Sequence, residues 1–219
     1  MKNKFVFGIV YILLLFFGFF SIYSNTSFGH IHITSAFLAN LAQRIFGLTL
    51  FTMLFVQIIL GSFMRRLTEI FGGWIFKFHV LEGITIYSLV LLHITSFILF
   101  RYFAGLGLDP FYIFTDFCLL CKTKSELYIT LGRLSFWLIT TTVFAGLFRT
   151  LNPFMRIHWK KFHILNYLVF LLIGIHGFLL GTDFGYMPFF VFAIVAYVAV
   201  LVVIMVKSAK FIKNSKNHA

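Results

Sequence analysis

The stretch HWKKFHILNYLVFLLIGIHG, residues 158–177, holds His163 and His176 with twelve uncharged residues between them. Most of these are Leu, Ile, Val or Phe, as expected for a helix inside a membrane. A second stretch, HVLEGITIYSLVLLH, carries His79 and His93 at its two ends. Ionisable groups are costly inside a bilayer and usually mark function there. The four histidines are therefore candidates for one shared function.

The composition indicates a membrane protein. Of the 219 residues, 61% are hydrophobic and only 11% are charged, whereas soluble domains carry about 25% charged residues. Runs of about 20 apolar residues can cross a hydrocarbon layer about 30 Å thick as helices. Six such runs lie at 5–23, 41–63, 79–100, 127–148, 162–180 and 187–206. Because the runs are continuous and do not alternate, they predict an all-α polytopic bundle with six transmembrane helices and not a β-barrel.

The net charge of +12 follows the predicted topology and does not suggest a nucleic-acid partner. Thirteen of the 18 basic residues fall at one set of helix ends: Lys2, Lys4, Arg65, Arg66, Lys77, Arg149, Arg156, Lys160, Lys161, Lys207, Lys210, Lys213 and Lys216. Loops rich in Lys and Arg remain on the cytoplasmic side. The sequence thus predicts a multi-pass protein of the inner (plasma) membrane with both termini in the cytoplasm, surrounded by the lipid bilayer. The first span resembles a signal peptide, but its apolar run is long and lacks a clear cleavage site, so a retained helix is favoured.

The predicted outer side carries two further groups. Cys118 and Cys121 stand in the longest loop, at 101–126, where a disulfide, a redox or metal role, or two free thiols all remain open. His30 and His32 could bind a transition metal, including a ferric or cupric substrate.

The spacing of the four intramembrane histidines suggests two metal-binding pairs. His79 and His163 begin the third and fifth predicted spans, and His93 and His176 lie about 20 Å further along at 1.5 Å per residue. Both spans run in the same direction, so the histidines form two pairs at two matching depths. A flat metal macrocycle such as haem, held between two helices, needs this arrangement.

The angular spacing fits less well. His79 and His93 share a face of an ideal helix, whereas His163 and His176 do not. A distortion near Gly174 could reconcile them, or the two haems could lie on different sides of the helix pair. His158 is expected to be a bystander in the loop before the fifth span. The alternative for all four histidines is a role as satisfied core residues or as a proton relay.

At these residues the chain resembles the ferric reductase-like transmembrane domain family. The similar features are six spans, the two histidine pairs, and the stretches LHITSF (92–97), ITLGRLSF (129–136) and HWKKFHILNYLVF (158–170). The resemblance covers roughly residues 40–185 of a membrane domain over 1–206, which a basic cytoplasmic tail, 207–219, follows. In size the chain is close to the bacterial haem subunit that serves a periplasmic methionine sulfoxide reductase. Fused members of the family continue into a flavin and nicotinamide domain after the sixth helix, and this sequence does not.

The resemblance implies two b-type haems, one ligated by His79 with His163 and the other by His93 with His176. The predicted function is transmembrane electron transfer. The donor would be a cytoplasmic flavin reductase, with FMN or FAD, or membrane quinol, and the acceptor a periplasmic redox protein or ferric ion. Haem propionates need cationic partners, and Arg133 and Arg44 are the candidates near the outer haem.

Two questions stay open in the sequence. Glu82, expected in the first turn of the third span, is interpreted as a carboxylate favoured at a helix N-terminus, with a quinol-site role as the alternative. A histidine-relay proton channel or transporter without haem is the rival function, and a structural membrane anchor is a third.

Overall fold

The computed structural model describes residues 2–26, 33–118 and 120–216. Within these ranges the chain forms helices and no strands. The helices are α1 (Lys2–Ser24), α2 (Ser35–Phe71), α3 (Trp74–Phe103), α4 (Tyr112–Thr115), α5 (Lys124–Phe148), α6 (Pro153–His163), α7 (Leu165–Leu180) and α8 (Phe189–Lys216).

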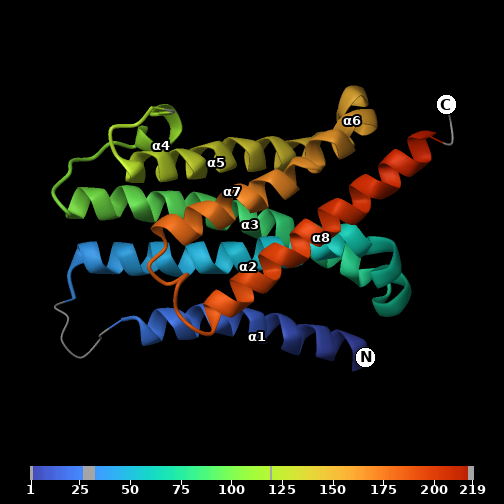
Figure 1. Cartoon of the computed structure of the whole chain (residues 1–219), viewed down its shortest axis with the longest axis horizontal. Coiled ribbons are helices and arrows are strands. Elements are labelled where there is room, and N and C mark those ends of the chain that lie inside the picture. The colour runs from blue at the N-terminus through green and yellow to red at the C-terminus, as the bar shows by residue number, and fades with distance from the viewer. Residues whose placement is uncertain (1, 27–32, 119, 217–219) are drawn as a thin grey trace.

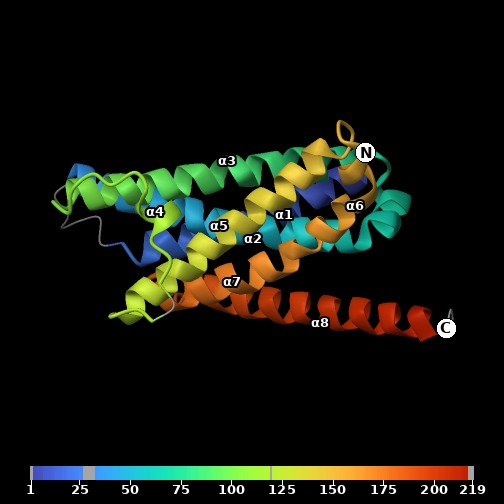
Figure 2. The ribbon, with the colours of Figure 1, turned by 90° about the horizontal axis from the view of Figure 1, so that it is seen from above.

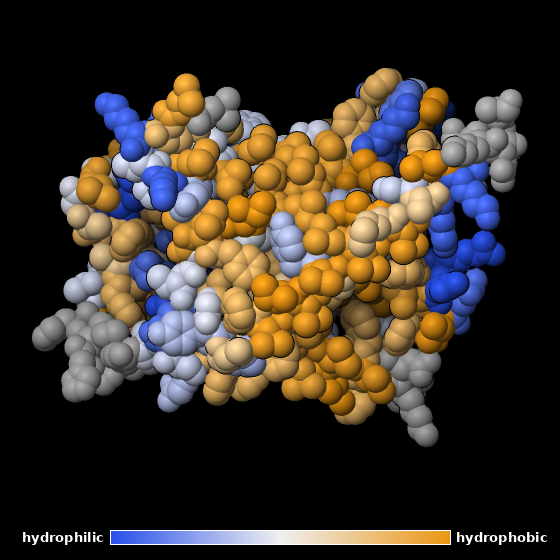
Figure 3. All heavy atoms as spheres, viewed as in Figure 1, coloured by the Kyte–Doolittle hydropathy of each residue, from blue (hydrophilic) through white to orange (hydrophobic). Residues whose placement is uncertain are grey.

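Six helical segments are long and apolar enough to cross a membrane, with α6 and α7 together forming the fifth. The structure confirms the predicted all-α bundle of six spans and hence a multi-pass membrane protein. On the face shown in Figure 3, apolar side chains cover the middle of the molecule and polar side chains gather toward its two ends. The second and third spans are longer than predicted, because α2 begins at Ser35 and α3 begins at Trp74.

The two ends of the bundle differ in what they carry. We call them the termini end, where α1 begins and α8 ends, and the loop end, where α4 lies (Figures 1 and 2). The α2–α3 turn and α6 also lie at the termini end. The helix ends that carry the thirteen basic residues are therefore gathered at the termini end.

Helix α2 forms the centre of the bundle and packs against α1, α3, α7 and α8. Its Phe51 is 2% exposed and stacks on Phe170 of α7 with ring centroids 4.9 Å apart. Phe189 and Phe192 of α8 contact the same ring edge-on. Such aromatic pairs add about 0.5 to 1.5 kcal/mol each beyond the burial of their surface. This aromatic cluster fixes α2, α7 and α8 relative to one another.

A kink in α2 at Phe63, where φ is −117° and ψ is 16°, ties the termini end together. Lys207 of α8 donates a hydrogen bond of 2.7 Å to the Ser62 carbonyl oxygen. The Ser62 hydroxyl lies 2.8 Å from the Tyr167 hydroxyl of α7. The kink thus presents α2 polar groups to two other helices.

The turn between α2 and α3 places His79 and Glu82 deeper in the third span than the sequence predicted. Gly72 has φ of +88°, a conformation that side chains with a Cβ rarely adopt, so α2 ends there and α3 can start two residues later. His79 consequently lies in the second turn of α3, not at its start, and Glu82 lies in the third turn, 3% exposed. The interpretation of Glu82 as a carboxylate at an interfacial helix N-terminus is therefore wrong.

The fifth span is interrupted at Ile164, between α6 and α7. His163 is the last residue of α6, and His176 lies within α7, so the angle of an ideal helix does not relate them. The predicted distortion near Gly174 is not found: Gly174 lies inside α7 against the Tyr197 ring.

A buried ion pair closes the loop end. Arg44 of α2 binds Asp183, in the α7–α8 connection, through Nε to Oδ2 at 2.7 Å and Nη2 to Oδ1 at 2.5 Å. The Asn25 amide, just after α1, donates to the same carboxylate at 2.9 Å. The side chains of Arg44 and Asp183 are 16% and 3% exposed. Arg44 is therefore held inside the protein instead of extending to lipid headgroups.

We expect Asp183→Asn to destabilise the protein by about 3 to 5 kcal/mol, because Arg44 would remain as a buried charge without its counter-charge. The thermal midpoint of the detergent-solubilised variant should fall accordingly. Glu69→Gln is the matched control: it breaks the Arg65–Glu69 pair, whose side chains are 95% and 66% exposed, and exposed pairs contribute little. Equal midpoints in the two variants would contradict the role given to Asp183.

Candidate functional site

The structure brings the four intramembrane histidines together in the two predicted pairs. The rings of His79 and His163 have centroids 6.2 Å apart, toward the termini end. His93 and His176 line one cavity toward the loop end. Along α3 the two levels are separated by fourteen residues, about 21 Å of helix.

Both histidines of the loop-end pair have a defined tautomer. His93 Nδ1 lies 3.0 Å from the Gln43 carbonyl oxygen of α2, and His176 Nδ1 lies 2.8 Å from the Tyr128 carbonyl oxygen of α5. A carbonyl can only accept, so each Nδ1 must carry the proton. The Nε2 lone pair of each neutral ring is then free to bind a metal. Metal-ligating histidines usually donate their other ring nitrogen in this manner.

Glycines allow these rings to approach the neighbouring helices. A Cβ on Gly47 of α2 would lie 3.2 Å from His93 Cε1, and one on Gly132 of α5 would lie 2.9 Å from His176 Cε1. Each glycine comes four residues after the carbonyl that its histidine binds. A side chain at Gly132 would therefore displace the His176 ring, and one at Gly47 would require the His93 ring to shift by a few tenths of an ångström.

The same spacing recurs fourteen residues further along both helices. Gly61 of α2 faces the His79 ring, and a Cβ added there would lie 3.3 Å from Cε1 of that ring. On α5, the backbone of Thr142 interacts with the His163 ring. Gly146 follows four residues later, but a Cβ added there would meet nothing within 4 Å among the described residues. Gly47, Gly61 and Gly132 were not among the predicted site residues, although the interval Gly47–Gly61 equals the interval His79–His93 and could have revealed the two glycines of α2.

The termini-end pair has the spacing that a shared metal needs. A metal between two imidazoles holds their ring centres about 6 Å apart, from two bonds of about 2 Å and about 1 Å within each ring. The observed 6.2 Å fits this value. The ring nitrogens differ from those of the other pair: His79 Nδ1 is buried without a partner among the described residues, and His163 Nδ1 lies 3.4 Å from Asn166 Nδ2.

The residues fit a haem better than a bare metal ion. Among the described residues no three His, Cys, Asp or Glu side chains gather around one point, whereas structural zinc sites take four protein ligands and catalytic sites three. A macrocycle brings four nitrogens of its own, so two opposed imidazoles suffice. The cavity at His93 and His176 has about 360 Å³, within the range of about 300 to 1,000 Å³ for small-molecule sites.

Two arginines line this cavity, and they differ in availability. Arg44 is already bound to Asp183 through two nitrogens. Arg133 of α5 is 1% exposed, and its Nε and Nη2 are buried with no partner in the described part of the chain. Buried donors without partners are costly, which makes Arg133 the better candidate to bind an anionic group in the cavity.

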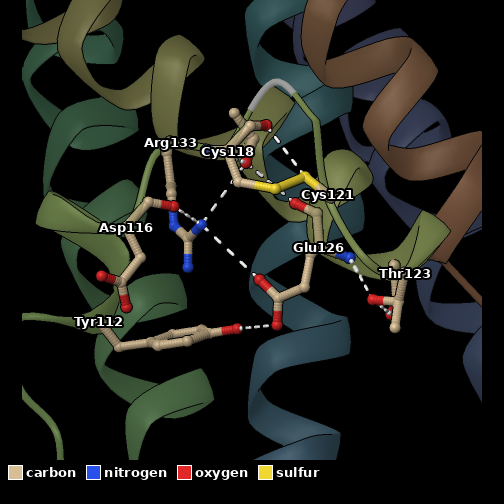
Figure 4. The surroundings of a disulfide bond; sticks show 9 residues. Tyr112, Asp116, Cys118, Cys121, Thr123, Glu126 and Arg133 are labelled. Carbon is tan, nitrogen blue, oxygen red and sulfur yellow. Dashed lines mark hydrogen bonds and ion pairs between the residues drawn. A yellow bond between two sulfur atoms is a disulfide. The ribbon is translucent and has the colours of Figure 1, made fainter.

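The remaining contacts of Arg133 hold it beneath the long loop (Figure 4). Its Nη1 donates to the Asp116 carbonyl oxygen and lies 3.8 Å from Glu126 Oε2. Its guanidinium carbon lies 4.5 Å from the centre of the Tyr112 ring. Arg101 stacks on Tyr112 as well, at 4.0 Å. Arg133 is thus fixed on one side and unpaired on the other.

Of the alternatives left open for Cys118 and Cys121, the structure shows the disulfide (Figure 4). The Cys118 amide donates to Thr130 Oγ1 of α5 at 3.4 Å, which attaches the loop near Arg133. His30 and His32 lie outside the described residues. His158 lies within α6, not in a loop as predicted; its Nδ1 faces the Phe154 carbonyl oxygen of its own helix at 2.9 Å, away from both pairs.

Glu82 is the most unusual polar group in the spans. Neither carboxylate oxygen has a hydrogen-bond partner within the described chain. The Tyr11 hydroxyl of α1 faces the carboxylate without reaching hydrogen-bonding geometry. A carboxylate buried in this way is unfavourable unless it is protonated, so we infer that Glu82 is neutral.

Comparisons with known proteins add no relative. A scan against protein-family models, a search of curated proteins and a search of solved structures find no match to this chain. The resemblance to the ferric reductase-like family therefore stays a prediction, and the case for a function depends on the geometry of the two histidine pairs.

The pKa of Tyr112 offers a test of the loop-end cluster. Burial raises this pKa, and the hydrogen bond and charge of Glu126 raise it further, against the opposing charges of Arg101 and Arg133. We expect Glu126→Gln to lower it, measured as tyrosinate absorbance in alkaline titration relative to Tyr112→Phe. Because folding raises the pKa of Tyr112, this group stabilises the folded protein fully below about pH 10. This contribution to the free energy of unfolding is lost as the pH rises through the pKa of Tyr112 in the folded protein. An unchanged titration in Glu126→Gln would contradict the contact.

Proposed function

We propose that this chain carries electrons across a membrane through two b-type haems. One haem would be held by His79 and His163, and the other by His93 and His176. The observation that carries the proposal is the state of the loop-end pair: two imidazoles on different helices flank one cavity, and each has Nδ1 bonded to a helix carbonyl and Nε2 free. Satisfied core histidines would not need both features.

The protein would supply position and charge. A bound haem takes up and releases one electron at a time. The carbonyls of Gln43 and Tyr128 orient the two imidazoles, and the hydrogen bonds raise the basicity of their Nε2 atoms. The unpaired nitrogens of Arg133 would bind a propionate, whereas Arg44 is the lesser candidate because Asp183 neutralises its charge and bonds to its Nε and Nη2.

Two levels of histidines divide the crossing into shorter electron steps. Between them the core is filled by apolar side chains such as Ile86, Ile139 and Val169, which exclude water from the path. The core residues therefore keep the two sites at fixed positions and favour transfer of an electron without an accompanying ion.

We assign the termini end to the cytoplasm and the loop end to the outside. The basic residues at the termini end support this orientation through the positive-inside rule, and the Cys118–Cys121 disulfide at the loop end suits an oxidising compartment. A membrane potential negative inside would favour outward electron flow, by about 2.3 kcal/mol per 100 mV for one charge crossing fully. The donor would be a flavin reductase, with FMN or FAD, or membrane quinol. The acceptor would be a periplasmic redox protein or ferric ion.

The deciding measurement is the dithionite-reduced minus oxidised visible spectrum of the purified protein, with haem quantified per chain. We expect two b-type haems per chain. His79→Ala or His163→Ala should remove one of them, and His93→Ala or His176→Ala the other, because each pair shares one metal. His158→Ala is the control and should retain both. Loss of both haems from a stably folded single variant would contradict the pairing.

The glycine contacts give a second prediction. Gly132→Val should reduce the haem content from two per chain to one, because the added side chain would occupy the space of the His176 ring. Gly8→Val is the matched control, since a Cβ at Gly8 meets nothing within 4 Å among the described residues. Full haem content in Gly132→Val would show that the ring does not depend on its approach to α5.

The burial of Glu82 is the one observation that favours the rival function. A histidine-relay proton channel or transporter needs protonatable groups in the spans, and Glu82 is one that is buried and, among the described residues, unpaired. The two proposals separate in one preparation. Absence of haem after expression with ample haem, together with proton flux into vesicles that Glu82→Gln abolishes, would favour the rival.

A further inference from the structure

A chain of three side chains connects the termini-end histidine pair to the buried face of α5. Thr142 of α5 is 1% exposed, and its Oγ1 lies 2.8 Å from one end of the Asn166 amide in α7. The other end of that amide lies 3.4 Å from His163 Nδ1. The Thr142 hydroxyl also lies 2.9 Å from the Ile139 carbonyl oxygen.

The protons available to these groups restrict how they can be arranged. The Thr142 hydroxyl has one proton, and the Ile139 carbonyl can only accept, so the proton is best directed there. The hydroxyl oxygen is then free to accept a hydrogen bond. The Asn166 amide has an acceptor end and a donor end of the same shape, so its partners decide which end is which.

Donation from the amide NH₂ to Thr142 orients its oxygen toward His163. The His163 Nδ1 proton can then bond to this oxygen, and the Thr142 hydroxyl, the Asn166 amide and the His163 ring each have an acceptor for one proton. The structure places the amide in the reversed orientation, with Oδ1 toward Thr142 and Nδ2 toward His163, although the two ends have the same shape and can be exchanged. In that orientation the Thr142 proton would be shared between two acceptors, and the amide NH₂ would face an unprotonated Nδ1. That reversed arrangement would place the ring proton on Nε2, where it would block metal binding.

We propose that Asn166 is a positioning residue for His163: its amide oxygen accepts the Nδ1 proton and so presents Nε2 to the metal. The proposal rests on the function proposed above and assigns to a side chain the role that backbone carbonyls have at His93 and His176. His79 Nδ1 lacks a partner of either kind in the described chain. Asn166 is therefore the single side chain in the described structure that fixes the tautomer of a paired histidine.

The Thr142 carbonyl oxygen is the competing acceptor. It faces the His163 ring and stands in the position that the Gln43 and Tyr128 carbonyls hold at the other pair. It is not in hydrogen-bonding geometry with either ring nitrogen, whereas the Asn166 amide is. Substitutions at Asn166 distinguish the two acceptors, since they leave the backbone of Thr142 unchanged.

The test compares Asn166→Asp, Asn166→Leu and Thr142→Val with wild type by redox titration and visible spectra of both haems. The relevant haem is the one that His163→Ala removes. Asn166→Asp has an acceptor of nearly the same shape and should retain this haem. Its negative charge should raise the basicity of the imidazole and change the reduced-to-oxidised ratio at least tenfold toward the oxidised form, a shift of about 59 mV. Asn166→Leu should lose haem at this pair, and Thr142→Val should shift its potential less than Asn166→Asp.

The other haem and one further variant provide the controls. The haem at His93 and His176 should titrate as in wild type in every variant. Tyr167→Phe removes a neighbouring polar group whose hydroxyl bonds to Ser62, so it should leave both haems unchanged. If the haems of Asn166→Asp and Asn166→Leu both titrate as those of Tyr167→Phe do, the proposal is overturned and the role belongs to the Thr142 carbonyl. A wild-type protein without haem would overturn the proposed function and this inference together.

Discussion

The site depends on one repeated interaction, the hydrogen bond from a histidine Nδ1 to a carbonyl oxygen of a neighbouring helix. It is formed at His93 with Gln43 and at His176 with Tyr128. An ordinary helix has its carbonyls bonded internally and its surface covered by Cβ atoms, so the close approach of an imidazole to a carbonyl is easiest where a side chain is absent. Gly47 and Gly132 provide that access. The position of the imidazoles is therefore set by helices that carry no ligand themselves.

This interaction explains why α2 and α5 matter as much as α3 and α7. On α2, Gly47 and Gly61 lie against the rings of His93 and His79, at the interval of fourteen residues that separates these histidines on α3. On α5, Gly132 lies against the His176 ring. The equal interval allows one helix to accommodate rings at two levels. The two levels are nevertheless unequal, because backbone carbonyls orient the loop-end rings and the Asn166 amide is the partner at the termini end. Two haems held in this way would have different axial-ligand environments within one bundle.

The distribution of charged side chains also differs between the two ends of the bundle. The loop-end cavity holds two arginines, of which one is neutralised by Asp183 and one keeps two donors free of partners in the described chain. The termini end carries its cations at the helix ends. Buried charge is thus concentrated at the cavity and at the pair that closes it, where it is either compensated or available to an anion.

Much of this was predictable from the sequence. The six spans follow from apolar runs of sufficient length, and the pairing of the four histidines follows from their spacing on two parallel spans, because a helix converts residue number directly into depth. Rotation about a helix axis is less predictable, since a single interruption changes it. The boundary between α6 and α7 at Ile164 lies between His163 and His176, and the early start of α3 placed Glu82 in the interior.

The sequence by itself determined the membrane class, the number of spans and the depth of each histidine, because these depend on composition and on rise per residue. Only the tertiary structure decided which groups surround them. It paired Arg44 with Asp183 across 139 residues, left two donors of Arg133 without partners in the described chain, and placed glycines of α2 and α5 against the rings. These contacts join helices distant in the chain, and local periodicity carries no record of which helix packs against which.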